Sequence, residues 1–300
     1  MYVDDIKRLK EKIMTAEAIV IGAGAGLSTA AGFIYDGETF KKYFFDFIEE
    51  YDITDIYSGG FYPFSDKEIM WAWWSRHIYF NRYVKAPKNT YNNLSKLVND
   101  RNYFVITTNV DHQFQKADFD KERLFYTQGD YGLWQSVNPR IKKTYDNELE
   151  VYKMLESQGF VKNSSGEYDL PDDGKISMRI PSSLIPKYPD DGSDMTMNLR
   201  SDDSFVEDEG WHKAANKYND FITKYKNDEV LYLELGVGMN TPAIIKYPFW
   251  QFVYNNKKST YACVNYGEAV CPSEIVDRSI VINDDIHKVI LDLLPETVIQ

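Results

Sequence analysis

A glycine-rich turn near the amino terminus constrains the fold of this chain more than any other feature. The apolar run at residues 18–21 is too short for a solvent-facing helix and indicates a buried strand. It is followed by Gly22-Ala-Gly-Ala-Gly-Leu-Ser28 and by small residues up to Gly32, which suits a helix packed closely on a sheet. Glycines let the backbone take positive φ and approach a ligand, and a helix N-terminus presents N–H groups to an anion. The stretch is therefore a candidate diphosphate cradle.

Spacing excludes two common nucleotide-binding versions of such a turn. The dinucleotide fingerprint G-x-G-x-x-G requires its last glycine where this chain has Leu27 or Thr29. A Walker-type phosphate loop requires a lysine before Ser or Thr, and no lysine lies between Ala18 and Asp36. The alternative to a nucleotide site is a simple packing turn between strand and helix, and the turn alone does not decide between them.

The composition of the 300 residues narrows the class of protein further. A hydrophobic content of 43% and an aromatic content of 15% fit a folded globular chain with a sizeable core. No apolar run reaches the roughly 18 residues of a membrane-spanning helix, and the amino terminus lacks the pattern of a signal peptide. Two cysteines cannot build a disulfide framework, so a cytoplasmic location is expected. The net charge of −12 argues against a nucleic acid as partner.

Strands and helices alternate along most of the chain. Short apolar runs predict strands at residues 18–21, 103–108, 124–127, 230–235, 260–264 and 279–282. Apolar residues at helical spacing predict helices at residues 4–16, 90–99, 212–226 and 285–294. This alternation predicts an α/β fold with a Rossmann-like, mostly parallel sheet and helices on both of its faces.

Two segments interrupt the alternation and are expected to form smaller inserts. Residues 39–87 have a helical pattern and many aromatic side chains, which we expect to form core rather than a ligand cage. Residues 131–210 are dominated by Asp, Asn, Ser, Gly and Pro and are expected to form a small loop-rich module. The Rossmann-like domain then comprises residues 1–38, 88–130 and 211–300.

Polar residues follow the predicted strands at the carboxyl ends, where α/β sheets bind their ligands. Asn109 and Asp111 follow the strand at 103–108, and Gln128 follows the next strand. A second glycine turn, residues 236–240, follows the strand at 230–235. The alternative role for Asn109 and Asp111 is to cap the following helix.

Four segments resemble signatures of the sirtuin family and occur in that family's order. They are Gly24-Ala-Gly-Leu-Ser28, Thr107-Thr-Asn-Val-Asp111, Gly236-Val-Gly-Met-Asn-Thr-Pro-Ala243 and Val264-Asn265. The second segment differs from the sirtuin T-Q-N-[IV]-D at its glutamine. The resemblance implies the sirtuin fold, NAD as the cofactor and a set of NAD-binding residues. That set is Gly22, Ala23, Gly24, Ala25, Gly26, Ser28, Tyr35, Asn109, Asp111, Gly236, Gly238, Met239, Asn240 and Asn265.

Within the family, the chain looks most like the macrodomain-linked microbial class, which resembles protein ADP-ribosyltransferases more than deacylases. The similar stretches are residues 22–28, 106–115 and 125–133. In that class a glutamine replaces the histidine that precedes a glycine in other sirtuins, and Gln128 stands at that position here. The resemblance implies an acceptor protein, which in that class is a lipoylated glycine-cleavage H-like carrier.

The resemblance also implies catalytic roles for three residues, Asn109, Asp111 and Gln128. Asn109 would place the nicotinamide ribose and its water, and Asp111 would hold the carboxamide. Ser28 and the surrounding N–H groups would take the diphosphate.

Two departures from the family pattern affect these expectations. The common P-D-F-R segment is absent, so the role of its arginine is unassigned, with Tyr35 and Asp36 as weak candidates. Many sirtuins also carry a zinc ribbon, whereas residues 131–210 contain no cysteine. Tyr188 and Asp191 stand in what looks like one of its cysteine pairs. Structural zinc takes sulfur or nitrogen ligands, so we expect no metal.

Cleavage of the nicotinamide glycosidic bond builds positive charge on the ribose, and deacylation further requires a base for a ribose hydroxyl. Histidine can supply that base, but a glutamine amide can only hydrogen-bond. We therefore expect an NAD-dependent mono-ADP-ribosyltransferase that modifies a protein. One alternative is a deacylase with His112 or Asp130 as the base, although His112 fits a surface histidine equally well. The other is a non-catalytic NAD-binding module.

Overall fold

The computed structural model describes residues 2–295 and divides the chain into two compact units. Unit 1 consists of Met1–Phe33, Ala86–Gln128 and Glu207–Gln300, and unit 2 consists of Ile34–Lys85 and Gly129–Val206. Most of the segment expected to form a helical insert and most of the segment expected to be loop-rich thus belong to one and the same unit.

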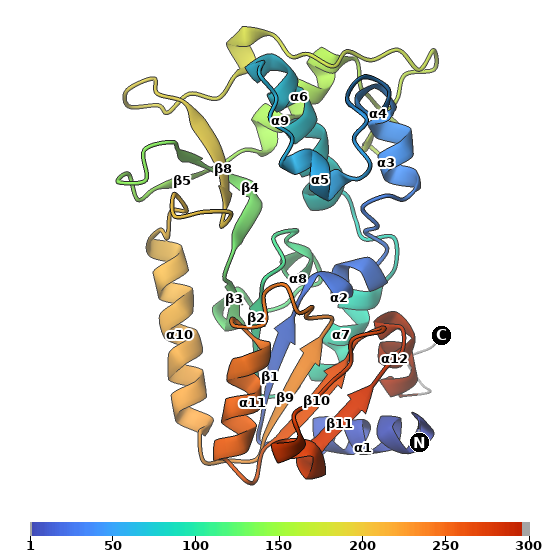
Figure 1. Cartoon of the computed structure of the whole chain (residues 1–300), viewed down its shortest axis with the longest axis vertical. Helices are drawn as coiled ribbons and strands as arrows, with labels where there is room; N and C mark the ends of the chain where they lie inside the picture. The colour runs from blue at the N-terminus through green and yellow to red at the C-terminus, as the bar shows by residue number, and fades with distance from the viewer. Residues whose placement is uncertain (1, 296–300) are drawn as a thin grey trace. The chain divides into compact units, whose positions relative to one another are not determined.

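A six-stranded sheet forms the centre of unit 1, in the order β11-β10-β9-β1-β2-β3 (Figure 1). Every neighbouring pair in it is parallel, which confirms the predicted sheet. The strands are β1 (Ala18–Ala23), β2 (Tyr103–Thr107), β3 (Leu124–Tyr126), β9 (Val230–Leu235), β10 (Thr260–Val264) and β11 (Ser279–Ile282). After β1 the chain adds β2 and β3 on one side of that strand. It later adds β9, β10 and β11 on the other side. The topological switch point, where α/β sheets bind ligands, therefore lies between β1 and β9.

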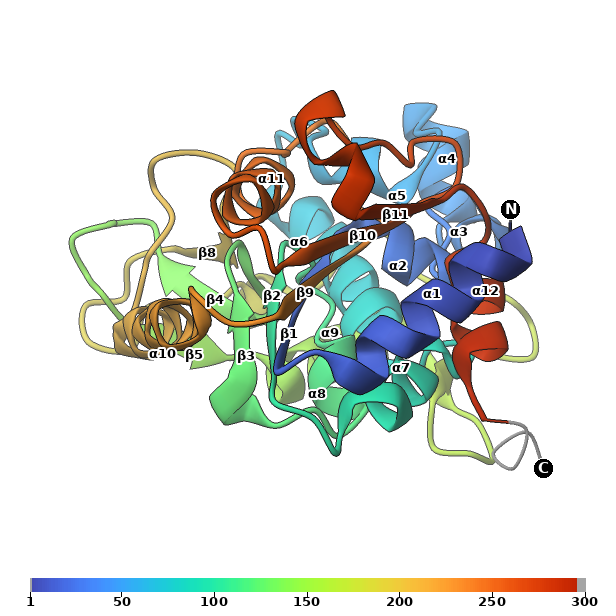
Figure 2. The ribbon, with the colours of Figure 1, turned by 90° about the horizontal axis from the view of Figure 1, so that it is seen from below.

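Helices cover both faces of this sheet (Figure 2). On one face, Tyr218 of α10 and Phe249 of α11 pack with Phe104 and Tyr232 of the sheet. On the other face lie α1, α7 and α12, and α12 contacts α1, α2 and α7. The helices of unit 1 are α1 (Tyr2–Thr15), α2 (Ala25–Ala30), α7 (Thr90–Val98), α8 (Gln113–Lys116), α10 (Glu209–Tyr225), α11 (Lys246–Asn255) and α12 (Ile286–Leu293), with 3-10 turns η2 (Lys121–Arg123) and η4 (Ser273–Arg278).

Local sequence explains most of these elements. All six residues of β1 are buried, as expected of a central strand covered on both faces. The side chains of Asp208 and Asp285 cap α10 and α12 by accepting from backbone N–H groups in the first turn. The sequence pattern did not predict α11, because Pro248 lies inside it. Proline is tolerated there because the first helical turn needs no N–H partner at that position.

The aromatic residues between 40 and 83 form the core of unit 2, as predicted. Phe44, Phe47, Trp71 and Trp73 are at most 1% exposed and belong to one hydrophobic cluster. The helices around them are α3 (Glu38–Tyr43), α4 (Phe45–Tyr51), α5 (Ile56–Gly60) and α6 (Lys67–Ile78), followed by the π-helical turn η1 (Tyr79–Tyr83).

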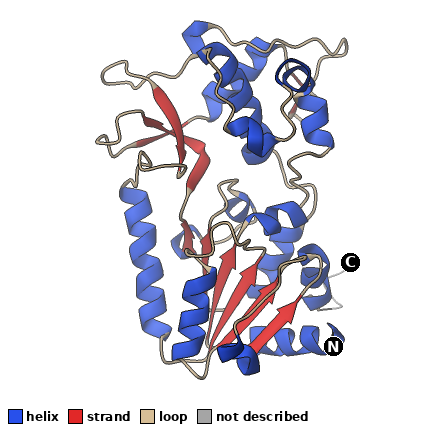
Figure 3. Cartoon of the chain, in the orientation of Figure 1, coloured by secondary structure: helices blue, strands red, loops and turns tan. Residues whose placement is uncertain are grey.

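The stretch expected to be loop-rich contains more regular structure than its composition indicates (Figure 3). An antiparallel sheet, ordered β5-β4-β8, and an eleven-residue helix lie within it. The helix forms because Val151, Met154 and Leu155 recur at helical spacing and are fully buried. The elements are β4 (Gly129–Ser136), β5 (Thr144–Asp146), α9 (Glu148–Gln158), β6 (Val161–Lys162), β7 (Tyr168–Asp169), η3 (Ser182–Leu184) and β8 (Met195–Leu199).

None of the helices within residues 2–295 has the length and hydropathy that crossing a membrane requires.

Candidate active site

The turns after β1 and β9 cross at the switch point, backbone against backbone. Gly26 N–H donates to the Gly236 carbonyl oxygen over 3.0 Å. A Cβ atom on Gly26 would lie 2.7 Å from Gly236 Cα, and Gly236 itself has φ of +64°. Both positions therefore require glycine, one for close approach and the other for approach and conformation.

Much of the first turn is hydrogen-bonded within the protein. Gly24 N–H donates to Leu235 O and Leu27 N–H donates to Gly24 O, both over 3.0 Å. The sequence predicted free N–H groups here, but the crossing with β9 and its turn uses those of Gly24 and Gly26. A diphosphate at the N–H groups of Gly24 and Gly26 would compete with these bonds, so its contact with this turn stays a prediction.

Four side chains beside the turn form one continuous hydrogen-bonded chain. Asn109 Nδ2 donates to the Tyr91 hydroxyl (3.3 Å), which contacts Ser28 Oγ (2.9 Å). Ser28 Oγ in turn donates to Asp111 Oδ2 (2.5 Å). An amide nitrogen only donates and an ionised carboxylate only accepts, so both hydroxyls donate in the direction of Asp111. Ser28, Tyr91 and Asp111 are each less than 10% exposed.

These hydrogen bonds fix the orientation of the Asn109 amide. Its nitrogen donates to Gly24 O (3.0 Å) as well as to Tyr91, and the Asn109 backbone N–H donates to Thr107 Oγ1 (3.0 Å). Within the described part of the chain, Asn109 Oδ1 has no hydrogen-bond partner. The strand end therefore presents a positioned acceptor atom, which fits a ligand that carries hydroxyl groups, such as a ribose.

Asp111 also has the capping role considered from the sequence. Its second oxygen, Oδ1, accepts from Gln113 N–H over 3.2 Å at the start of α8. His112, between these two residues, has φ of +62°. Asp111 thus joins the end of β2 and the start of α8 to Ser28.

Gln128 follows the neighbouring strand end and is partly buried. The preceding residue, Thr127, bonds twice to the Thr107 carbonyl oxygen, at 2.9 Å through its N–H and at 3.1 Å through Oγ1. Gln128 is therefore anchored beside the strand that carries Asn109. Asp130, the alternative base, belongs to unit 2, where its carboxylate pairs with Arg82 Nε at 2.6 Å.

The remaining NAD-binding candidates lie in different environments. Asn265 follows β10, is 7% exposed and donates through Nδ2 to Val237 O (3.3 Å), so it lies against the turn after β9. Gly238 is partly buried, whereas Met239 and Asn240 are exposed. Their contact with NAD stays a prediction.

Three further candidates do not belong to the chain of hydrogen-bonded side chains described above. Gly22 and Ala23 are buried within β1 itself. A side chain on Gly22 would collide with Ile245 and Phe249. Tyr35 belongs to unit 2, where its ring centroid lies 6.0 Å from that of Tyr57.

Sequence reasoning missed Tyr91 as a site residue. It lies in the segment 90–99, which was predicted as a helix from its apolar spacing, and it is 2% exposed. Its ring meets Phe114 edge-on, as a core residue would. Periodicity cannot show that the hydroxyl reaches the end of another element, so no signal in the sequence separated Tyr91 from a purely apolar core residue.

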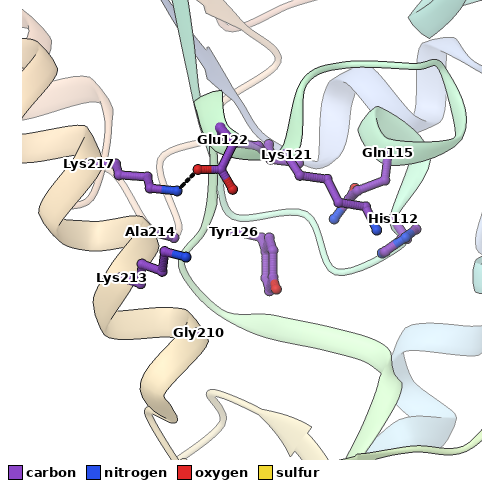
Figure 4. Close-up of a pocket in the computed structure, with 10 residues that line it drawn as sticks. His112, Gln115, Lys121, Glu122, Tyr126, Gly210, Lys213, Ala214 and Lys217 are labelled. Atoms are coloured by element: carbon purple, nitrogen blue, oxygen red, sulfur yellow. Dashed lines mark hydrogen bonds and ion pairs between the residues drawn. The ribbon is translucent and has the colours of Figure 1, made fainter.

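A cavity of about 150 Å³ lies between α8, β3 and α10 in unit 1 (Figure 4). His112 and Gln115 line it from the α8 side, and Lys213 and Lys217 line it from α10. Lys217 pairs with Glu122. Trp211 Nε1 donates to Thr127 O (3.1 Å), which holds the start of α10 against the end of β3.

Within residues 2–295, no group of three or more His, Cys, Asp or Glu side chains is arranged to hold a metal ion. Tyr188, from the expected position of a lost cysteine pair, is buried and bonds to Asp190 (3.0 Å). The absence of a bound metal stays a prediction.

No protein-family profile matches the chain, but two curated proteins are similar to it. One is named "Protein ADP-ribosyltransferase", from Staphylococcus aureus strain Mu50. It is 34% identical over 287 residues, which cover 95% of this chain and 86% of that protein. The other is named "Probable bifunctional ADP-ribose hydrolase/ADP-ribosyltransferase", from Fusarium oxysporum f. sp. cubense. It is 28% identical over 249 residues, which cover 80% of this chain and 38% of that protein.

Solved structures of Sir2 proteins share the fold. A Sir2 bound to a propionylated peptide matches with a TM-score of 0.61 and 18% identity, covering 98% of this chain and 99% of that one. A Sir2 with a p53 peptide and NAD+ matches with a TM-score of 0.61 and 19% identity over the same shares. The predicted fold is thereby confirmed.

Proposed function

Since this chain belongs to the sirtuin family, we propose that it is an NAD-dependent protein mono-ADP-ribosyltransferase. It transfers ADP-ribose to a protein acceptor and releases nicotinamide. The curated relative named protein ADP-ribosyltransferase supports the transfer, and the Sir2 structure with NAD+ supports the cosubstrate.

The observation that carries this proposal is the orientation of Asn109 at the carboxyl end of β2. Tyr91 and Gly24 hold its amide nitrogen, so Oδ1 is available to accept from a ribose hydroxyl or an ordered water. Bound NAD supplies the ADP-ribosyl group, whose bond to nicotinamide breaks as an acceptor nucleophile bonds to the same anomeric carbon. Positioning groups of this kind contribute by removing orientational freedom from the reacting atoms.

Gln128 favours transfer to a protein over deacylation. Its side chain can hydrogen-bond but cannot take a proton at physiological pH. Direct transfer needs no base for a ribose hydroxyl, because the proton of the acceptor nucleophile can pass to water. The deacylase alternative requires another base, and Asp130 is already paired with Arg82. His112 is then the remaining candidate base for a deacylase.

As acceptor we propose a lipoylated carrier protein of the glycine-cleavage H type, on the strength of the motif resemblance. A cytoplasmic location agrees with the two free thiols, Cys263 and Cys271.

The test is a product assay on the native chain. With NAD and the lipoylated carrier, we expect the intact mass of the carrier to rise by one ADP-ribosyl group. The same carrier without lipoate is the control for the acceptor. With NAD and an acetyl-lysine peptide, we expect little or no acyl-ADP-ribose, and abundant formation of that product would overturn the transferase assignment in favour of the deacylase.

A further inference from the structure

Cationic side chains surround the cavity of unit 1, although the chain as a whole has a net charge of −12. Lys121, Lys213 and Lys217 line it together with a single carboxylate, Glu122. Glu122 pairs with Lys217. Lys121 and Lys213 are exposed and have no ion pair among the described residues. Like charges around one concavity repel each other, and an anion placed between them relieves that repulsion.

The neutral lining also suits an oxygen-bearing anion. Figure 4 shows Lys121, Gln115 and His112 on one side of Tyr126 and Lys213 on the other, so amine, amide, imidazole and phenol groups surround one space. Amine, amide and hydroxyl hydrogens are the donors that carboxylates accept from.

The size of the cavity distinguishes between anions. Pockets that enclose a whole small-molecule ligand have volumes of roughly 300–1,000 Å³. The volume here is about 150 Å³, too small for a nucleotide but adequate for the end of one side chain. An occupant that reaches in from a larger body therefore fits better than a free metabolite.

The cavity lies directly beside the candidate active site. His112, in its lining, follows Asp111 in sequence, and Tyr126 is the last residue of β3, two positions before Gln128. A protein held here is thus held next to the strand ends that carry Asn109 and Gln128.

We propose that this cavity, defined by Lys121, Lys213 and Lys217, receives an Asp or Glu side chain of the acceptor protein. It is a docking subsite that holds an acidic surface of the acceptor beside the reacting centre. The identity of the partner as acceptor rests on the proposed function, whereas the recognition of an acidic side chain does not.

Binding is tested with the full chain and two fluorescein-labelled peptides, hexa-aspartate and hexa-lysine, at low ionic strength. We expect the acidic peptide alone to bind. The double variant Lys121→Glu/Lys213→Glu should bind it about tenfold more weakly, since two cationic partners of the peptide become anionic. Glu122→Gln should tighten binding, because it frees Lys217. The matched control is Lys224→Glu, at an exposed position of the same helix outside the cavity, and it should bind like the native chain.

Equal affinity of the native chain and the double variant would overturn the proposal, as would absence of binding to the acidic peptide. In the transfer assay, the double variant should raise the KM for the carrier about tenfold and leave nicotinamide release without acceptor unchanged. If no protein is ever modified, the proposed function fails, while the peptide measurement still decides whether the cavity recognises carboxylates.

Discussion

The amide of Asn109 shows how single residues on separate elements define the candidate site. Gly24 from the β1 turn and Tyr91 from α7 hold its nitrogen, and Ser28 links Tyr91 to Asp111. Every donor in this chain of bonds points the same way, so the loss of one hydroxyl leaves its neighbours free to reorient. Tyr91 therefore acts as a positioning residue for Asn109.

The variant Tyr91→Phe removes only the hydroxyl and keeps the ring that packs on Phe114. Because one hydrogen bond contributes on the order of 1 kcal/mol, and a buried polar group left without its partner costs somewhat more, kcat for nicotinamide release should fall about tenfold. The KM for NAD should change little. The control is Tyr103→Phe, because it also removes one hydroxyl, which in Tyr103 accepts from Asp120 N–H. Equal kcat values for native and Tyr91→Phe protein would refute the positioning role.

Residue identity alone could predict Asn109, Asp111 and Gln128 as neighbours, because each follows a parallel strand and strand ends meet at one edge of a sheet. It could not predict the partner of Ser28. The family resemblance implies a diphosphate contact for that hydroxyl, which stays a prediction, and in the fold the hydroxyl donates to Asp111, 83 positions away in the chain.

Among the elements, the two crossing turns fix where the site lies. Gly24 and Gly26 after β1 pack against Gly236 after β9, which joins the two halves of the sheet at its switch point. The strands were predictable from their apolar runs. The helix α11 was not, because Pro248 resembles a helix breaker until its place in the first turn is known.

Gly236→Ala should disrupt this crossing. Gly236 has a left-handed φ of +64°, which disfavours alanine. An added Cβ would also lie 2.5 Å from Leu27 N and 2.6 Å from Gly26 Cα. Gly267→Ala is the matched control, since Gly267 has φ of +82° but no atom within 4 Å of the added Cβ. The control should lose about 1 kcal/mol of unfolding free energy from conformation alone, and Gly236→Ala should lose at least twice as much. Urea unfolding that gives equal losses would mean that the crossing is not tight.

A buried ion pair joins α11 to the sheet. Lys246 Nζ lies 2.5 Å from Glu234 Oε1 and both side chains are fully buried. The Tyr261 hydroxyl donates to the other carboxylate oxygen over 2.6 Å. Burial, together with the nearby Glu234 carboxylate, raises the pKa of the Cys263 thiol to about 12, so this thiol stays protonated beside the pair.

Lys246→Met should leave Glu234 as an uncompensated buried charge and cost roughly 3–5 kcal/mol of unfolding free energy. Adding Glu234→Gln should recover most of that loss, because the charge is then gone. The exposed pair of Lys288 with Asp284 offers the comparison, and Lys288→Met should cost less than about 1 kcal/mol. A loss below 1 kcal/mol for Lys246→Met in urea unfolding would contradict this account.

For the whole molecule, acid stability depends on a histidine that the fold keeps neutral. His77 is 3% exposed, and neither ring nitrogen has a hydrogen-bond partner among the described residues. Its ring stacks on Trp74 with centroids 4.8 Å apart. Burial lowers the pKa of His77 to about 3, against about 6.5 in an unfolded chain.

The direction of this pH dependence of stability follows from proton uptake. Below about pH 6.5 the unfolded chain binds a proton at His77 that the folded chain refuses, so stability is complete above that pH and falls progressively toward pH 3. At pH 5 the loss is roughly 2 kcal/mol. His77→Phe should remove this part of the pH dependence, whereas His212→Gln, at an exposed position, should not. Identical pH profiles of unfolding free energy for native and His77→Phe protein would contradict the prediction.

We propose that the carboxyl ends of β1, β2 and β9 form a site that cleaves NAD. The most direct measurement is nicotinamide release by Asn109→Ala, with NAD affinity and melting temperature recorded on the same sample. Asn102→Ala, an exposed asparagine at the opposite end of β2, is the control. We predict a loss of about a hundredfold or more in turnover for Asn109→Ala, with the native melting temperature and with measurable NAD binding. Near-native turnover in this folded variant would contradict the assignment of the site.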